Sequence, residues 1–211
     1  RNSLQRVQAG VDMLRLDLEE NPQLIDQLDR IEKAGGNLTR LHEELREYAA
    51  PITLARKISD LREAWRIAWA HLGHQRQDRQ TELREETNGL DLNCPIDEFR
   101  IEQVFRNLME NSLAACSDPT IIDITCHDAL HSGAPAVCVS YRDNGPGLTD
   151  EQVKRIFEPF FTTKSKGTGL GMAIAERILE AHEGAIAVGS RDHGGAEFLI
   201  TFPRKESQAT R

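Results

Sequence analysis

The chain has 211 residues, of which 28% are charged and 39% hydrophobic, and its formal net charge at pH 7 is −8. These values are ordinary for a globular protein, and they argue against nucleic-acid binding, which needs a concentrated basic face. No apolar run approaches the roughly 20 residues of a membrane span, and no secretory leader is visible. The four cysteines are widely spread without a Cys-x-x-Cys pair. We therefore expect reduced thiols, a cytoplasmic location and no membrane contact by this stretch.

Residues 1–50 predict two helices that meet near Asn21-Pro22. Asn21 can cap the free N–H groups of the second helix, and Pro22 suits its first position. Apolar residues recur at alternating gaps of three and four, a heptad stripe that buries one seam against another helix. A homodimer that completes a four-helix bundle is one interpretation, and a hairpin packed on the following domain is the other. The stripe comprises Leu4, Val7, Val11, Leu14, Leu18, Leu24, Leu28, Ile31, Leu38, Leu41, Leu45 and Tyr48.

Residues 51–59 are expected to form a linker into a second domain over residues 60–205, with a polar tail at 206–211. Strand and helix patterns intermix in this second domain without regular βαβ alternation. The prediction is an α+β sandwich with a mixed sheet and helices on one face. Helices are expected at 60–76, 98–116, 149–156 and 169–182, and strands at 81–86, 90–94, 121–125, 136–141, 184–190 and 196–202.

Asn107 and Asn111 stand four positions apart in the predicted helix at 98–116, so both side chains leave one face. Asparagine offers a neutral carbonyl oxygen, and Mg²⁺ takes oxygen ligands from one or two protein groups together with phosphates and water. The pair is therefore a candidate Mg²⁺ site. Considered alone, two asparagines at this spacing usually indicate only surface polarity or helix capping.

The segment Asp143-Asn-Gly-Pro-Gly147 follows the predicted strand at 136–141 directly. A carboxylate at a strand end can accept the amino hydrogens of an adenine. Gly145 and Gly147 let the backbone approach a flat ring closely. A tight turn in which the Asp and Asn satisfy local backbone groups is the alternative.

A second glycine-rich segment, Gly167-Thr-Gly-Leu-Gly171, opens the predicted helix at 169–182. Glycines at a helix N-terminus expose backbone N–H groups, and the helix dipole favours anions there, so a triphosphate is a natural ligand. Lys164 and Lys166 come just before and can neutralise phosphate oxygens, although solvated loop lysines are the alternative. The glycine spacing alone is weak evidence, because such patterns recur by chance.

Between the two glycine-rich segments lies Phe157-Glu-Pro-Phe-Phe161-Thr-Thr-Lys164. Three phenylalanines in a segment flanked by Gly and Pro predict a loop that is anchored by apolar contacts. A movable cover over a bound nucleotide fits this composition. An ordinary buried loop is the other interpretation.

In order, the Asn pair, Asp-x-Gly-x-Gly, Phe-x-Pro-Phe and Gly-x-Gly-x-Gly resemble the motifs of the GHKL ATP-binding superfamily, which includes gyrase and histidine kinases. The resemblance covers residues 95–203 and implies the GHKL (Bergerat) fold, with ATP and Mg²⁺ as cofactors. It implies Asn111 as the Mg²⁺ ligand, Asn107 in support of the metal–phosphate site, and Asp143 on the adenine amino group. It places the hinge of the lid at Gly145 and Gly147, and phosphate contacts at Gly167, Thr168, Gly169, Leu170 and Gly171.

Residues 1–50 resemble the dimerisation and phosphotransfer hairpin of histidine kinases. Arg1-Asn2-Ser3-Leu4 resembles the end of the signature His-Glu-x-Arg-Asn-x-Leu. The resemblance implies a longer protein with its acceptor histidine just before Arg1. It makes Asn2 a candidate for a phosphatase activity toward the partner regulator. His42, on the second helix, is then a structural or surface histidine.

Together the resemblances imply the catalytic core of a two-component sensor histidine kinase. Such an enzyme, a homodimer, autophosphorylates on a histidine with Mg·ATP and passes the phosphoryl group to an aspartate in the receiver domain of a response regulator. A GHKL ATPase and a non-enzymatic nucleotide-binding dimeric scaffold are the alternatives. Asn107 stands where the resemblance expects a glutamate base in the ATPases, which argues against fast hydrolysis.

Two departures from the histidine kinase pattern stand out. Ala114-Ala115 replace a basic and an aromatic residue after the second Asn. Gly195-Ala196-Glu197-Phe198 replaces Gly-Thr-x-Phe, so the threonine hydroxyl expected near the adenine is missing.

Overall fold

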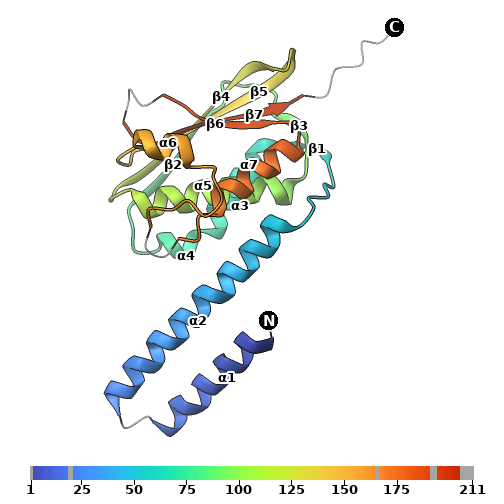
Figure 1. The fold of residues 1–211 in the computed structure, drawn as a ribbon. Coiled ribbons are helices and arrows are strands. Elements are labelled where there is room, and N and C mark those ends of the chain that lie inside the picture. The colour runs from blue at the N-terminus through green and yellow to red at the C-terminus, as the bar shows by residue number, and fades with distance from the viewer. Residues whose placement is uncertain (1, 19–20, 165–166, 191–193, 205–211) are drawn as a thin grey trace.

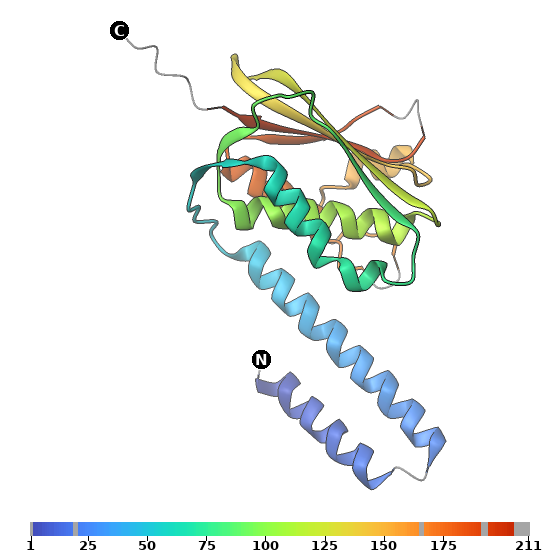
Figure 2. The same ribbon diagram turned by 180° about the vertical axis from the view of Figure 1, so that it is seen from behind.

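The computed structural model describes residues 2–18, 21–164, 167–190 and 194–204. The side chains of residues 2–4, 16, 17 and 22 lie outside this description, as does the tail expected at 206–211. The chain forms a long helical hairpin and an α/β unit (Figures 1 and 2).

The hairpin consists of α1 (Asn2–Asp17) and α2 (Pro22–Ala49), which lie side by side in both views (Figures 1 and 2). The predicted start of the second helix is confirmed, because Oδ1 of Asn21 accepts a hydrogen bond of 3.3 Å from the Leu24 N–H. Across the hairpin, Arg15 pairs with Asp29 at 2.6 Å and with Glu32 at 2.7 Å. Ion pairs therefore join the two helices, and a side chain caps the start of α2.

Two short strands stand between the hairpin and the main sheet. Strand β1 (Lys57–Asp60) overlaps the end of the segment expected to be a linker, and it pairs antiparallel with β3 (Asn93–Ile96). Asp60 then caps α3 (Leu61–His71) by accepting the Arg62 N–H at 2.9 Å. A one-turn helix, α4 (Gly73–Arg76), follows.

The main sheet has five strands in the order β2-β4-β5-β7-β6. Strand β2 pairs parallel with β4, and every other neighbouring pair is antiparallel, which confirms the predicted mixed sheet. β4 and β5 form a longer hairpin than expected, closed by Ser132 and Gly133 with φ of 52° and 82°, the values typical of a two-residue hairpin turn. The strands are β2 (Thr81–Glu86), β4 (Thr120–His131), β5 (Ala134–Asp143), β6 (Ala185–Val188) and β7 (Glu197–Pro203).

Helices α3, α5 (Glu98–Ala115) and α7 (Gly171–Ala181) cover one face of this sheet (Figures 1 and 2). The predicted two-layer α+β architecture is therefore confirmed. The core lies between the layers, where the buried rings of Trp65 and Phe105 meet edge to face at 5.5 Å. A further short helix, α6 (Asp150–Arg155), stands between the two glycine-rich segments. Within the described residues, no helix has both the length and the apolar character needed to span a membrane.

Candidate active site

Asp143 ends β5 at the edge of the helix layer and is only 6% exposed. Its Oδ1 accepts hydrogen bonds from the backbone N–H groups of Gly145 (2.9 Å) and Ala196 (3.0 Å). Its Oδ2 accepts one from the Ser112 hydroxyl at 2.7 Å. The carboxylate is thus fixed in direction by three donors from three segments of the chain. A buried carboxylate held in this way suits recognition of a ligand donor such as an adenine amino group.

Sequence reasoning missed several groups around Asp143. Ser112 comes from α5, and its hydroxyl lies 2.9 Å from that of Tyr141 on β5. Ala196, which takes the place of the expected threonine, contributes its backbone N–H rather than a side chain. Burial raises the pKa of the Cys116 thiol to about 11, and the nearby charge of Asp143 adds to the rise. No sequence signal links Ser112, Tyr141 and Cys116 to Asp143, because these residues meet it only through packing of α5 on the sheet.

The glycines at 145 and 147 stand where the chain leaves β5 for the predicted lid. Gly147 has a φ of +76°, and a Cβ there would lie 2.9 Å from the carbonyl oxygen of Gly195. A side chain at this position would be strained and would collide with the opposite backbone. Gly145 has close neighbours too, since a Cβ would meet the Cys116 Sγ at 2.9 Å. Because Gly145 and Gly147 have no side chains, only backbone atoms of these two residues can lie next to the Asp143 carboxylate.

Asn107 and Asn111 have different contacts although they share a face of α5. Asn107 donates from Nδ2 to the carbonyl oxygen of Gly171 at 2.8 Å, which fixes the first residue of α7 against α5. Asn111 accepts at Oδ1 from the ammonium group of Lys164 at 2.7 Å. Burial lowers the pKa of Lys164. The side-chain oxygen of Asn111 on α5 therefore binds a cationic group, the ammonium group of Lys164, in the loop before the glycine run.

The glycine run at 167–171 ends where α7 begins. Helix α7 starts at Gly171, and its N-cap Leu170 provides no side-chain hydrogen bond to the helix N–H groups. Gly169 has a φ of +72°, and its carbonyl accepts the Phe160 N–H at 2.9 Å. Leu170 is fully buried, so its side chain belongs to the core. The arrangement leaves a helix N-terminus without a side-chain cap, a common binding position for phosphate.

Thr168 contacts the hairpin. Its hydroxyl donates a short hydrogen bond to Glu44 on α2 and accepts the Leu170 N–H at 3.4 Å. Nearby, Arg100 pairs with Glu47 at 3.0 Å. The end of α2 is therefore attached to the same loop that is expected to hold phosphates.

Arg177 on α7 adds a further attachment of α2 to the α/β unit. Its guanidinium lies 4.9 Å from the centre of the Tyr48 ring and donates to the carbonyl of Ala50 at 3.2 Å.

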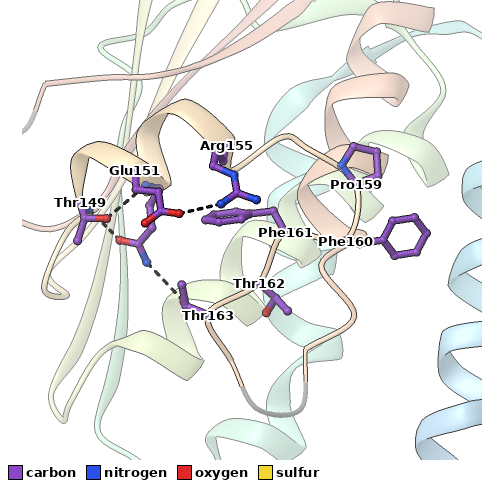
Figure 3. A pocket seen from close by; sticks show the side chains of 9 residues that line it. Thr149, Glu151, Arg155, Pro159, Phe160, Phe161, Thr162 and Thr163 are labelled. Atoms are coloured by element: carbon purple, nitrogen blue, oxygen red, sulfur yellow. Dashed lines mark hydrogen bonds and ion pairs between the residues drawn. The ribbon is translucent and has the colours of Figure 1, made fainter.

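The segment between the glycine motifs surrounds a cavity of about 590 Å³ (Figure 3). Arg155 lies over the Phe161 ring at 4.4 Å and pairs with Glu151 at 2.7 Å. Phe157 packs against the core, whereas Phe160 is 57% exposed and points away from Arg155 and Phe161 (Figure 3). The expectation that three phenylalanines anchor this loop is wrong for Phe160, because its side chain is exposed to solvent.

Among the predicted nucleotide-site residues that the structure describes, direct contacts join Asn107 to Gly171, Asn111 to Lys164 and Asp143 to Gly145. Asn107, Asn111, Asp143, Lys164 and the glycines come from α5, β5, the intervening loop and the start of α7. Lys166 lies outside the described residues, as does the side chain of Asn2 in the first turn of α1.

The model of the histidine kinase-, DNA gyrase B-, and HSP90-like ATPase family matches residues 96–206, more than half of the chain. The chain belongs to this family. The sensor histidine kinase ZraS of Escherichia coli K12 is 34% identical to it over 180 residues, which are 83% of this chain and 38% of ZraS. The chain therefore spans less than half of the curated relative that it matches.

Solved structures agree with this assignment. The catalytic domain of histidine kinase ThkA matches with a TM-score of 0.62 at 32% identity, covering 72% of this chain and 97% of that chain. Full-length ShkA in complex with AMPPNP gives 0.74 at 26% identity, over 96% of this chain and 43% of that chain. ThkA in complex with the response regulator protein TrrA gives 0.71 at 25% identity, over 97% and 59%. The predicted GHKL-type domain of the sensor histidine kinase class is confirmed.

Proposed function

We propose that the chain binds Mg·ATP and acts as a protein-histidine kinase, transferring the γ-phosphoryl group to a histidine of a dimeric hairpin. The observation that carries this proposal is the convergence of Asp143, the Asn111–Lys164 pair and the N-terminus of α7 at one end of the helix layer. A fixed carboxylate, an amide oxygen that already binds a cation, and helix N–H groups without a side-chain cap match the base, the metal and the phosphates of a nucleotide. The relative ShkA was solved with AMPPNP, which supports ATP as the ligand.

Phosphoryl transfer depends mainly on positioning and on charge neutralisation. Asp143 would hold the adenine amino group, and the backbone of residues 167–171 would hold the phosphates. Lys164 would neutralise phosphate oxygens as the bond from the γ-phosphorus to ADP breaks and a phosphorus–nitrogen bond to histidine forms. The lid segment would exclude water, which otherwise competes with the histidine.

The residues present fit Mg²⁺. Asn111 Oδ1 is a hard oxygen donor that binds the ammonium group of Lys164, so this position favours positive charge. We assign Asn111 as the protein ligand and Asn107 as a supporting residue, since Asn107 holds Gly171 in place through Nδ2. When bound, Mg²⁺ would neutralise phosphate charge during the transfer.

Rapid ATP hydrolysis is not the function that these residues favour. A hydrolase needs a base to activate water, and the amide of Asn107 cannot accept a proton at neutral pH. Its Nδ2 is already engaged with the Gly171 carbonyl. We therefore prefer a protein-histidine kinase over a GHKL ATPase and over a nucleotide-binding scaffold without enzymatic activity.

The hairpin supports a homodimer. Val7, Met13, Leu14, Ile31, Leu38 and Leu45 are each more than 40% exposed along α1 and α2. A second hairpin would cover them in a four-helix bundle. We propose a response-regulator receiver domain as the phosphoryl acceptor, supported by the relative ThkA in complex with TrrA. We also propose Asn2 as a candidate residue for a phosphatase activity toward the response regulator. We further propose a cytoplasmic location.

The proposal is tested by titrating Mg·ATP into the chain by calorimetry. Asp143→Asn should weaken binding about tenfold or more, because a charged acceptor of the amino group is lost. Asn111→Ala should remove most of the dependence of ATP binding on Mg²⁺. Wild-type affinity and Mg²⁺ dependence in both variants would overturn the assignment of the site.

A further inference from the structure

A chain of hydrogen bonds leads from the protein core to the Asp143 carboxylate. Tyr141 lies two residues before Asp143 on β5, on the same face of the strand, and is fully buried. Its hydroxyl lies 2.9 Å from that of Ser112, which in turn lies 2.7 Å from Asp143 Oδ2. Ser112 is itself only 1% exposed on α5. The three groups therefore form a buried chain of two hydrogen bonds, surrounded by the apolar core.

The direction of the protons in this chain of hydrogen bonds follows from the chemistry of the groups. An ionised carboxylate only accepts hydrogen bonds, so Ser112 must use its single proton on Asp143. The Ser112 oxygen is then the acceptor, and Tyr141 the donor. Burial raises the pKa of Tyr141 well above 10, so the phenol keeps this proton. Each donor polarises the next, which strengthens the bond to the carboxylate.

We propose that Tyr141 and Ser112 are positioning residues that set selectivity for a base with an amino group, by fixing the lone pairs of Asp143. This inference rests on the proposed ATP site, because it assigns a role to Asp143 there. Neither residue touches the base, and both act through the carboxylate. The N–H groups of Gly145 and Ala196 hold the other oxygen, so the carboxylate cannot rotate about its bond without breaking contacts on both sides.

A fixed carboxylate discriminates better than a free one. An amino group at the purine 6-position donates a hydrogen bond to the carboxylate. A hydrogen atom at that position makes no hydrogen bond, and an oxo group is a second acceptor that the carboxylate repels. Without the Ser112 contact, Oδ2 can turn toward other donors or water. The site then no longer prefers a base with a 6-amino group over a base without one. The predicted consequence is a loss of discrimination rather than a general loss of nucleotide affinity.

The experiment compares Mg·ATP with Mg·purine riboside triphosphate, which lacks only the amino group, by calorimetry on the 211-residue chain. For the wild type we expect ATP to bind about ten times more tightly or better, as for one hydrogen bond to a charged group. In Ser112→Ala the preference should fall to about threefold or less, and in Tyr141→Phe to an intermediate value. Binding of purine riboside triphosphate should stay within about twofold of wild type in both.

Ser140→Ala is the matched control. This serine is one residue from Tyr141, but its hydroxyl donates to Glu197 at 2.7 Å on the opposite face of the sheet. It should leave the preference unchanged. Thermal unfolding of each variant checks folding, and Tyr141→Phe, which removes one oxygen only, keeps the test valid if Ser112→Ala does not fold.

The outcomes separate the two proposals. A wild-type preference that persists in both folded variants, or an equal loss for both nucleotides, overturns the positioning role while the ATP site stands. A wild type that binds neither nucleotide, or binds both equally, contradicts the assignment of Asp143 itself and with it this inference.

Discussion

Lys164 donates a hydrogen bond from its ammonium group to Oδ1 of Asn111 across 2.7 Å, although 53 positions separate the two residues in the chain. The bond links the loop before the glycine run to the helix that carries our proposed Mg²⁺ ligand. The lysine contacts the same oxygen that we assign to the metal. Because an ammonium group and Mg²⁺ repel each other, we expect Lys164 to leave this oxygen if Mg·ATP binds.

Replacing Lys164 with Met should weaken ATP binding about tenfold, because a charge-assisted contact to phosphate is lost. ADP, which lacks the γ-phosphate, should lose less. Calorimetry with both nucleotides measures the difference. Lys154→Met, an exposed lysine on α6, serves as the control. An equal loss for ATP and ADP would show that Lys164 does not act on the γ-phosphate.

Replacing Glu44 with Ala should strengthen ATP binding about threefold to tenfold. Glu44 places a carboxylate on the hydroxyl of Thr168, within the proposed phosphate loop, and two negative groups near each other repel. Glu43→Ala, an exposed neighbour, removes the same charge without this contact and should have a smaller effect. Weaker binding by the Glu44 variant would contradict the competition between Glu44 and phosphate.

The double change of Ile31 and Leu38 to Glu should give a monomer. These side chains are 47% and 54% exposed on α2, and charges in a helix bundle seam oppose association. Sedimentation velocity above micromolar concentration measures the mass. Asn37→Glu, also exposed on α2, should remain dimeric. A wild-type chain that sediments as a monomer would remove the basis for a dimer through this hairpin.

The free energy of unfolding should decrease as pH rises from about 9 to about 12. Burial raises the pKa of Cys94 and of Cys126 from 9.0 to about 12. Above pH 9 the unfolded chain therefore releases thiol protons that the folded chain retains, and unfolding becomes more favourable with rising pH. Urea titrations at pH 8 and at pH 10.5 test this, and Cys126→Ala should reduce the difference. A difference that is unchanged in this variant would exclude Cys126 as a cause.

The motifs identified Asp143 and Asn111 as candidate site residues, but not the contacts around them. These two could be proposed because a strand end and a helix face are visible in the local sequence. The Ser112 hydroxyl and the Ala196 N–H could not, because they reach Asp143 only through the packing of α5 and the register of β5 against β7. Glu44 was missed for the same reason, since its contact with Thr168 depends on where α2 meets the domain.

Short and irregular elements were also harder to predict. Strand β1 at residues 57–60 has four residues and exists by pairing with β3, so a linker was the natural expectation from composition alone. The β4–β5 hairpin extends beyond its apolar centre because backbone pairing continues to His131 and Ala134 after the side-chain pattern becomes polar.

Helix α7 begins at the glycine loop and meets the end of α2 through Arg177, about 9 Å further along its axis. The end of α2 also contacts Thr168, just before α7 begins, through Glu44. The hairpin therefore contacts α7 and the loop before it at two places. We expect a displacement of α2 to reach the start of α7 through these contacts without involving the sheet.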